Sequence, residues 1–131
     1  LAAAALDLAL AHAGRREIFD GTVLDLQAIQ FMLADVETDI VAGRLLYERA
    51  AALLGTPEGV VAAAHAKRFN PDMALRAAVS CAESLGSYGW LNETPLPRFI
   101  GLAKMLQTVD GTTEIQRVVI ARDLVRRAAA L

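Results

Sequence analysis

Apolar residues recur along this chain at steps of three and four, the spacing that places them on one face of an α-helix. The longest run extends from Leu26 to Leu54, roughly eight helical turns. This seam predicts a long helix packed nearly antiparallel to its neighbours in a bundle. Its positions are Leu26, Ile29, Leu33, Val36, Ile40, Gly43, Tyr47, Ala50 and Leu54.

Turn and capping residues mark the ends of further helices. An Ala- and Leu-rich stretch from Leu1 to about Ala13 predicts a well-buried first helix that ends at a glycine. A Thr-Pro-Glu sequence is typical of a helix start, so a third helix is expected from Pro57 towards Leu85. Asn70-Pro71 inside that segment is locally a stop and restart signal. Lys67 and Arg68 are expected on its solvated face.

A last apolar stripe follows Gly111 and runs towards the end of the chain. It predicts a final helix with one buried face. With the short loops between segments, this periodicity predicts an all-α fold, an up-and-down four-helix bundle. The stripe consists of Ile115, Val119, Ile120, Leu124 and Val125.

Composition agrees with a helical domain and excludes several classes of function. The 131 residues are 55% apolar and rich in Ala, which favours helix over sheet. A net charge of −2 gives no reason to expect nucleic acid or an anionic membrane. Cys81 is the single cysteine, so neither a disulfide nor a Cys-built metal site is expected. No apolar run is long enough for a membrane span. Because the pattern is already helical at Leu1, residues 1–131 are expected to be one domain of a longer polypeptide.

Three stretches interrupt the helical pattern, and each has an ordinary structural explanation. Residues 109–113 join two helices, because Asp110-Gly111 is a turn dipeptide and an Asp or Thr there can cap the next helix. The stretch from Arg15 to Thr22 can be a solvated basic loop whose Phe19 plugs the core. Gly86, which follows the third helix, can be a helix-ending glycine.

These stretches resemble segments of the acyl-CoA dehydrogenases, a family of flavoproteins, and they follow one another in the same order and at the same intervals. The resemblance covers essentially the whole chain. Residues 109–117 read Val-Asp-Gly-Thr-Thr-Glu-Ile-Gln-Arg, similar to the family's Tyr-Glu-Gly-Thr-x-x-Ile-Gln-Arg. In that family the acidic residue abstracts the substrate α-proton. The resemblance therefore implies that Asp110, one methylene shorter than Glu, is the catalytic base. It further implies substrate contacts at Val109 and Gly111, and cofactor contacts at Thr112 and Glu114.

The other two stretches match family segments that contact the flavin nucleotide. Arg16, Phe19, Val23 and Gln27 match Arg-x-x-Phe-Gly-x-x-Ile-x-x-x-Gln, whose Arg reaches the pyrophosphate, often from the neighbouring subunit. An Arg fork suits this task because it donates bidentate charged hydrogen bonds. The stretch from Glu83 to Trp90 resembles a Gly-rich turn at which backbone approaches the cofactor. The implied flavin contacts are Arg16, Phe19, Gln27, Glu83, Gly86, Ser87, Thr112 and Glu114.

The sequence departs from the family pattern at three positions within these two stretches. Asp20 stands where the family has Gly, and Glu83 where it has Gln, so two acids lie near an expected diphosphate. Ser87 replaces a Gly of the turn.

The resemblance implies the C-terminal helical domain of an acyl-CoA dehydrogenase, with the third helix continuous but kinked and an additional short helix from Phe99 to Gln107. It implies FAD as cofactor, an acyl-CoA substrate, a homodimer or homotetramer with a hetero-oligomer as an alternative, and an electron-acceptor flavoprotein. The expected compartment is the bacterial cytoplasm or, in a eukaryote, the mitochondrial matrix.

Three hypotheses of function follow. The first is an active FAD-dependent dehydrogenase with Asp110 as base. The second is a catalytically weak subunit paired with an active one, suggested by Asp110, Glu83 and Ser87 together. The third is a helical interaction module without flavin.

Overall fold

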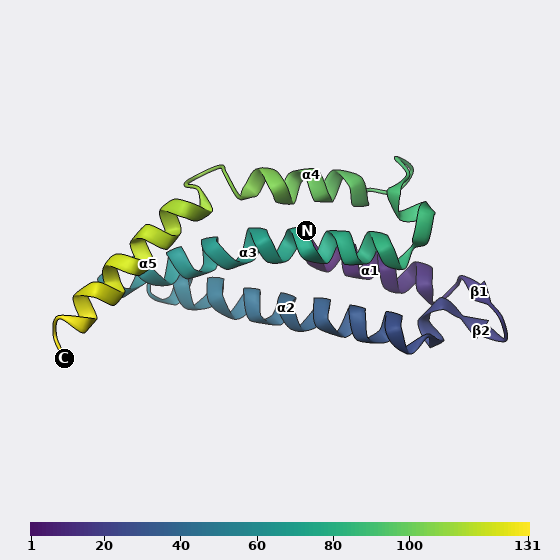
Figure 1. Ribbon diagram of the computed structural model, residues 1–131, viewed down its shortest axis with the longest axis horizontal. Coiled ribbons are helices and arrows are strands. Elements are labelled where there is room, and N and C mark those ends of the chain that lie inside the picture. Colours follow the sequence, from purple (N-terminus) through teal and green to yellow (C-terminus); the bar gives the residue numbers. More distant parts are fainter.

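Helix α3 is the element against which the other helices pack. In the computed structural model, which describes all of residues 1–131, it contacts α1, α2, α4 and α5 (Figure 1). The predicted all-α fold, a helical bundle with an additional short helix, is confirmed. No helix combines the length and apolar character needed to cross a membrane. The helices are α1 (Ala2–Ala13), α2 (Gln27–Ala52), α3 (Pro57–Ser84), α4 (Leu96–Leu106) and α5 (Thr113–Ala128).

Short irregular elements connect these helices. An antiparallel pair, β1 (Glu17–Ile18) and β2 (Gly21–Thr22), forms a small hairpin between α1 and α2. The 3₁₀ turns η1 (Val23–Asp25) and η2 (Gly86–Trp90) precede α2 and follow α3. The sequence had indicated a loop in place of the hairpin, because its strands are too short to show an alternating pattern.

The start and the course of α3 follow from its own residues. The Thr56 hydroxyl caps the helix by accepting a hydrogen bond from the Gly59 N–H at 3.1 Å, and Pro57 occupies the first turn. Pro71 lies inside the helix, which nevertheless continues to Ser84. The expectation of one continuous third helix is therefore confirmed.

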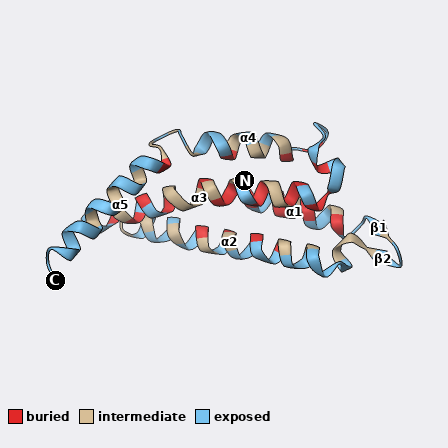
Figure 2. Ribbon diagram, in the orientation of Figure 1, coloured by how far each residue is buried: buried red, intermediate tan, exposed pale blue.

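The core is built largely from small side chains, which allow the helices to approach one another closely. At the crossing of α2 and α3, a Cβ on Gly43 would lie 2.2 Å from the Asn70 side-chain oxygen. Asn70 also donates a hydrogen bond to the Gly43 carbonyl at 3.2 Å, which ties the two backbones together. The core residues that Figure 2 colours red along α1 and α3 include Ala5, Ala9, Met73, Ala77, Cys81 and Ala82.

The seam of α2 is buried only in its middle. Leu33, Val36, Ile40 and Gly43 are buried as expected, whereas the side chain of Leu54 is 86% exposed. Tyr47 and Leu26 are also exposed, and Ile29 and Ala50 are half-buried. The ends of the seam are left open because α1 is only 12 residues long and cannot cover the 26 residues of α2.

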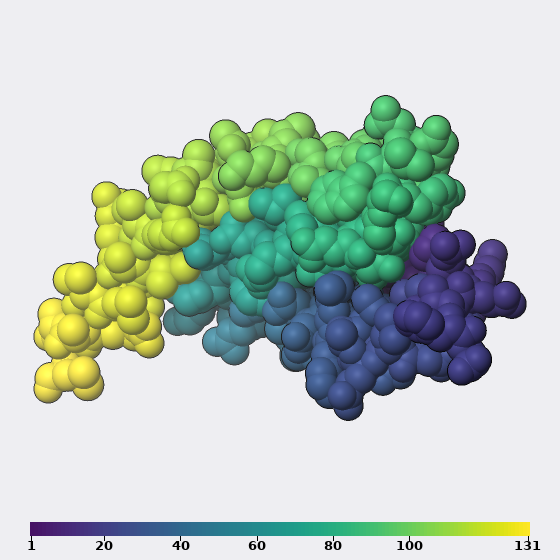
Figure 3. Space-filling model, turned by 45° about the vertical axis from the view of Figure 1, so that its right-hand side comes forward, coloured from purple at the N-terminus to yellow at the C-terminus, as the bar shows by residue number.

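The expected buried stripe of the last helix is also wrong. Ile115 and Leu124 are exposed, and Val125 is 70% exposed. Val119 and Ile120 are half-buried, so Thr113 is the one buried residue of α5. The reason is the path of α5, which leaves the bundle at an angle so that its C-terminal half projects beyond the other helices (Figures 1 and 3).

Burial of Cys81 makes a testable contribution to stability at alkaline pH. Burial raises the pKa of the Cys81 thiol from its ordinary value of 9.0 to about 11. Folding therefore favours the protonated thiol, and this stabilisation is complete below pH 9 and is lost as pH rises through 11. We expect the free energy of unfolding to fall by about 2 kcal/mol across that window. Urea denaturation at several pH values measures this loss. Cys81→Ala, which retains every other titrating group, is expected to lack this part of the slope; equal slopes in the two proteins would contradict it.

Candidate functional site

The turn between α4 and α5 has an unusual backbone conformation at the expected catalytic position. Asp110 has φ 54° and Gly111 has φ 94°, both in the left-handed region. Asp is among the few residues with a side chain that enter this region readily, and Gly does so without strain. A Cβ on Gly111 would also lie 2.8 Å from the Gln116 side-chain amide. The Asp-Gly pair is thus the local reason for this sharp turn.

The polar groups of Asp110 are free. The residue is exposed, and its carboxylate takes part in no hydrogen bond or ion pair within the chain. The backbone N–H groups of Asp110, Gly111 and Thr112 also have no backbone acceptor. A carboxylate acceptor and several amide donors are therefore available to a molecule bound at the turn.

Thr112, and not Asp110, caps the last helix. Its hydroxyl accepts a hydrogen bond from the Ile115 N–H at 3.3 Å. Thr112 alone therefore provides the helix cap, and Asp110 has no capping role.

Glu114 is held as an anion in the first turn of α5. Its own backbone N–H and then the Thr113 hydroxyl, at 3.1 Å, lower the pKa of its carboxyl. Arg117 forms an ion pair with it at 2.9 Å. The exposed carboxylate is also placed at a helix N-terminus, where negative charge is favoured.

Polar contacts to α3 fix the position of the turn. Lys67 donates a hydrogen bond to the Leu106 carbonyl at 2.8 Å, which satisfies an acceptor at the C-terminal end of α4. The Gln107 amide donates to Asp72 at 2.8 Å, and Asp72 is paired with Arg68. Lys67 and Arg68 are both half-buried in these contacts. The expectation that they lie on a solvated face is wrong, because α4 and the turn after it lie over that part of α3.

A cleft of about 840 Å³ opens beside the turn, and Asp110 lies on its edge. The opposite wall is the beginning of α3, where small or apolar side chains predominate. We call this space the Asp110 cleft. Its lining comprises Leu54, Gly55, Thr56, Pro57, Gly59, Val60, Ala63, Ala64, Lys67, Asp110, Gln116 and Val119.

The hairpin at the other end of the bundle exposes the expected flavin contacts. Phe19 lies at the hairpin tip with φ 49° and a side chain that is 96% exposed. The alternative in which Phe19 plugs the core is therefore wrong. Arg16 and Gln27 are exposed as well; Arg16 forms no ion pair within the chain.

The glycine-rich turn after α3 lies at the same end. Glu83 and Ser87 are exposed, and Gly86 has φ 61° with no atom near the position of a Cβ. Gly86 thus provides the left-handed residue that ends α3, which agrees with its interpretation as a helix-ending glycine. The close backbone approach is made by Gly89, where a Cβ would lie 2.1 Å from the Ala82 carbonyl oxygen of α3 itself.

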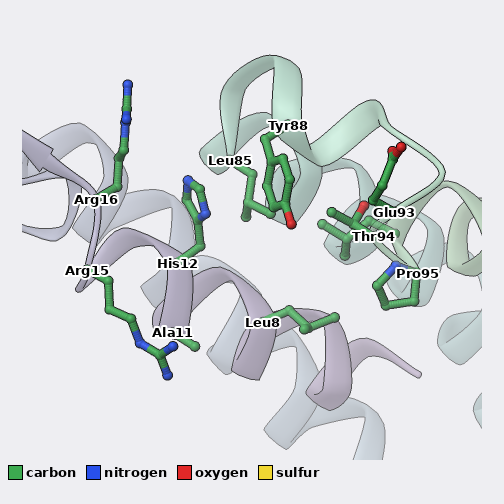
Figure 4. A pocket seen from close by; sticks show the side chains of 11 residues that line it. Leu8, Ala11, His12, Arg15, Arg16, Leu85, Tyr88, Glu93, Thr94 and Pro95 are labelled. Atoms are coloured by element: carbon green, nitrogen blue, oxygen red, sulfur yellow. The ribbon is translucent and has the colours of Figure 1, made fainter.

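A stacked aromatic pair joins the two segments at this end. The rings of His12 and Tyr88 lie 5.4 Å apart between centroids, at an angle of 16° (Figure 4). They border a pocket of about 410 Å³ that also includes Arg16 and Glu93, and Figure 4 shows the Arg16 side chain extending away from it. Sequence reasoning missed this pair, since no local pattern connects residues so distant in the chain.

The expected site residues therefore fall into two sets. Asp110, Val109, Gly111, Thr112 and Glu114 lie near the start of α3, and the hairpin and η2 lie near its end (Figure 1). A helix of 28 residues is about 42 Å long, so the two sets do not form one site on a single chain. The second set consists of Arg16, Phe19, Gln27, Glu83, Gly86 and Ser87.

Comparison with known proteins gives consistent matches. A sequence model of the acyl-CoA dehydrogenase C-terminal domain matches residues 1–125. The chain is 37% identical over 128 residues to a probable acyl-CoA dehydrogenase of Mycobacterium tuberculosis, covering 96% of this chain and 33% of that protein. It is 36% identical over 126 residues to the cyclohex-1-ene-1-carbonyl-CoA dehydrogenase of Geobacter metallireducens, covering 95% and 33%.

A solved structure is similar in fold as well as in sequence. Butyryl-CoA dehydrogenase from Megasphaera elsdenii superposes with a TM-score of 0.90 and 36% identity, over 95% of this chain and 33% of that one. The chain thus spans about a third of the length of the relatives that it matches.

The separate roles of Thr112 and Asp110 can be tested by stability. Thr112→Ala removes the cap of α5 and is expected to cost about 1 kcal/mol, with a loss of helical circular dichroism, whereas Thr112→Ser retains both. Asp110→Gly is expected to be nearly neutral, because Gly enters the left-handed region without strain and no side-chain bond is lost. Thermal unfolding of the three variants measures this. A loss in Asp110→Gly equal to that in Thr112→Ala would assign the cap to Asp110.

Proposed function

This chain belongs to the acyl-CoA dehydrogenase family, and on that premise we propose that it is the C-terminal helical domain of an FAD-dependent acyl-CoA dehydrogenase. The reaction is the removal of hydrogen from Cα and Cβ of an acyl-CoA thioester. The flavin supplies the acceptor for the β-hydrogen, which leaves as hydride. The observation that carries the proposal is Asp110, an unpaired carboxylate at the family's base position and at the edge of a cleft.

In this proposal the Asp110 carboxylate abstracts the α-proton. A carboxylate that already accepts hydrogen bonds or pairs with a cation is a poorer base, because those contacts stabilise its anion. Asp110 has no such contact within the chain. Lys67, the one cation of the cleft lining, instead donates a hydrogen bond to the Leu106 carbonyl.

The replacement of Glu by Asp has two opposing effects. Asp holds its carboxylate about 1.5 Å further back along the side chain, and a misplacement of about 1 Å can cost on the order of 100-fold in rate. The turn, however, requires a left-handed residue at this position, which Asp accepts more readily than Glu. The shorter acid therefore suits the backbone while reducing its reach.

The free amide groups of the turn supply a second element of the reaction. As the α-proton leaves, the thioester oxygen acquires negative charge and needs hydrogen-bond donors. The resemblance implies that the base's own backbone N–H is one of these donors. The Asp110 N–H has no acceptor within the chain, so it is available for this role whatever the length of the side chain.

The flavin nucleotide fits this chain only if two copies contribute to one site. Thr112 and Glu114 lie beside Asp110, whereas Arg16, Phe19 and Gln27 lie at the far end of the bundle. We propose that each flavin contacts the Asp110 end of one subunit and the hairpin end of another. The fully exposed Phe19 and the unpaired Arg16 agree with a role outside their own chain.

The role of Asp110 can be tested in the complete flavoenzyme. Asp110→Asn is expected to abolish reduction of the flavin by acyl-CoA and to leave flavin bound, since Asn is isosteric and fits the turn but cannot accept a proton. Anaerobic stopped-flow bleaching of the flavin absorbance measures reduction. Asp110→Glu is expected to keep or raise the rate. Reduction of Asp110→Asn at the parent rate would place the base elsewhere, and a parent enzyme that binds flavin without being reduced would favour a catalytically weak subunit.

The flavin contacts can be tested by flavin content. Arg16→Ala removes a charged hydrogen bond worth roughly 1.5–3 kcal/mol, so loss of flavin on dialysis is expected. Glu83→Gln removes a negative charge near the diphosphate and is expected to strengthen retention. Arg15→Ala is a matched control, because it removes a neighbouring guanidinium outside the family pattern. Flavin content that is unchanged in both Arg16→Ala and Glu83→Gln would contradict this placement.

A further inference from the structure

The chain contains the triplet Asp-Gly-Thr twice, at 20–22 in the hairpin and at 110–112 in the turn before α5 (Figure 1). In an Asp-Gly pair the side-chain carboxyl can react with the next peptide nitrogen, because glycine has no Cβ to obstruct the approach to that nitrogen. The product is a five-membered imide. Since the two triplets are identical, a difference in their reactivity arises chiefly from their structures.

At the second triplet no contact within the chain restrains the reacting groups. Asp110 is exposed, and its carboxylate accepts no hydrogen bond and forms no ion pair. The Gly111 N–H, whose nitrogen is the nucleophile, has no backbone acceptor. Both residues also lie outside every helix and strand. The nitrogen can therefore approach the side-chain carbon without first leaving another partner.

The first triplet is held by its surroundings. Gly21 belongs to β2 and pairs with Ile18 in the β1–β2 ladder. A Cβ on Gly21 would lie 2.7 Å from the Asp25 carboxylate, so the backbone is closely packed there. That carboxylate accepts hydrogen bonds from the Thr22 N–H at 2.7 Å and from the Thr22 hydroxyl at 2.9 Å. Rotation of the peptide that follows Asp20 would disturb these contacts.

We propose that Asp110-Gly111 is a site of spontaneous isomerisation, at which the chain modifies its own catalytic position. The Gly111 nitrogen attacks Cγ of the protonated Asp110 side chain. A C–N bond forms, the C–OH bond breaks, and the hydroxyl leaves as water with the proton of the nitrogen. The peptide bond is kept, and no oxidant, reductant or cofactor takes part.

One water molecule then opens the imide at either of its two carbonyl carbons. Attack at Cγ restores Asp110. Attack at the main-chain carbonyl of Asp110 breaks its bond to the Gly111 nitrogen and yields isoaspartate, in which the chain continues through the former side chain. Atoms balance over the two steps, because the water released on closure is replaced on opening. The product has the mass of the parent.

Isoaspartate would displace the base that the proposed function assigns to this turn. Its carboxylate is attached directly to Cα, so it lies about one further C–C bond, roughly 1.5 Å, back from the Asp110 position. The main chain gains one methylene before Gly111. Because a displacement of about 1 Å can cost on the order of 100-fold in rate, modification should inactivate the site. This consequence rests on the proposed function, whereas the isomerisation itself does not.

The experiment follows both triplets in one sample of the complete flavoprotein. The protein is aged in mildly acidic buffer, because the protonated acid is the form that releases water. Trypsin then gives peptide 105–117, which contains Asp110, and peptide 17–44, which contains Asp20. Chromatography with electron-transfer fragmentation separates isoaspartate from aspartate. A sample digested at the start corrects for isomerisation during digestion, and circular dichroism and flavin absorbance check that the protein stays intact.

Isoaspartate is expected to accumulate at 110 at least about fivefold faster than at 20, the factor that one backbone hydrogen bond holding the Gly21 peptide would supply. When the two peptides are aged in free form, similar rates are expected, because the hairpin is then lost. Flavin reduction by acyl-CoA is expected to fall in proportion to the isoaspartate found at 110.

Two variants serve as chemical controls. Asp110→Glu would close a six-membered ring and is expected to reduce modification at 110 by about tenfold or more, with the rate at 20 unchanged. Asp110→Asn forms the same imide with release of ammonia in place of water. Freshly prepared Asp110→Asn is expected to be inactive, and to regain flavin reduction on ageing as part of it becomes Asp110.

The outcomes separate this proposal from the proposed function. Equal rates at 110 and 20 in the folded protein would overturn the isomerisation site. So would aspartate that persists at 110 after the free peptide has isomerised. Isoaspartate at 110 with undiminished flavin reduction would support the modification site and would contradict the role of Asp110 as base.

Discussion

The close approach of the helices to α3 is the constraint on which the rest of the structure depends. Ala62, Ala66, Ala74, Ala77 and Ala82 present little volume, so neighbouring backbones lie near the axis of α3. At Gly43 an added Cβ would collide with the Asn70 and Met73 side chains, and Asn70 donates a hydrogen bond from α3 to the Gly43 carbonyl of α2. A core of this kind gains less from each buried side chain than a Leu-rich one, and relies more on contact between backbones.

Because α3 is long and central, its two ends present different chemistry. Around its middle, Lys67 and Asp72 bind Leu106 and Gln107 at the end of α4. The turn that carries Asp110 follows and lies beside the first turns of α3. At its end, η2 packs beside the N-terminal helix through the His12–Tyr88 stack. The intervening length keeps these regions apart on one chain. Oligomer formation is therefore the simplest way in which the two regions can contact one bound molecule, as in the proposed flavin site.

Several apolar side chains of this domain are left uncovered by its own helices. Val125 and Leu45 are both exposed, although each belongs to a helix with regular apolar periodicity. The two helices differ in their flanking residues. Glu37 and Arg44 of α2 are exposed and form no ion pair within the chain, whereas Asp123 of α5 is paired with Arg126 and Arg127.

Periodicity and capping chemistry by themselves determined that this chain is helical, where α3 begins, and that a sharp Asp-Gly turn precedes the last helix. These are local properties, because a residue's backbone preferences and its neighbours three and four positions away are visible in the sequence. The motif resemblance placed Asp110 at the position of a base for the same reason.

Only the tertiary structure decided which apolar faces are covered. The same three-and-four spacing occurs in the buried seam of α2 and along the largely exposed α5, and burial depends on the length and direction of the neighbouring helices. Tertiary structure also decided that Lys67 is tied to α4, that His12 meets Tyr88, and that the expected flavin contacts lie at two ends. Each of these depends on the juxtaposition of residues distant in sequence, which the folded arrangement of the helices alone establishes.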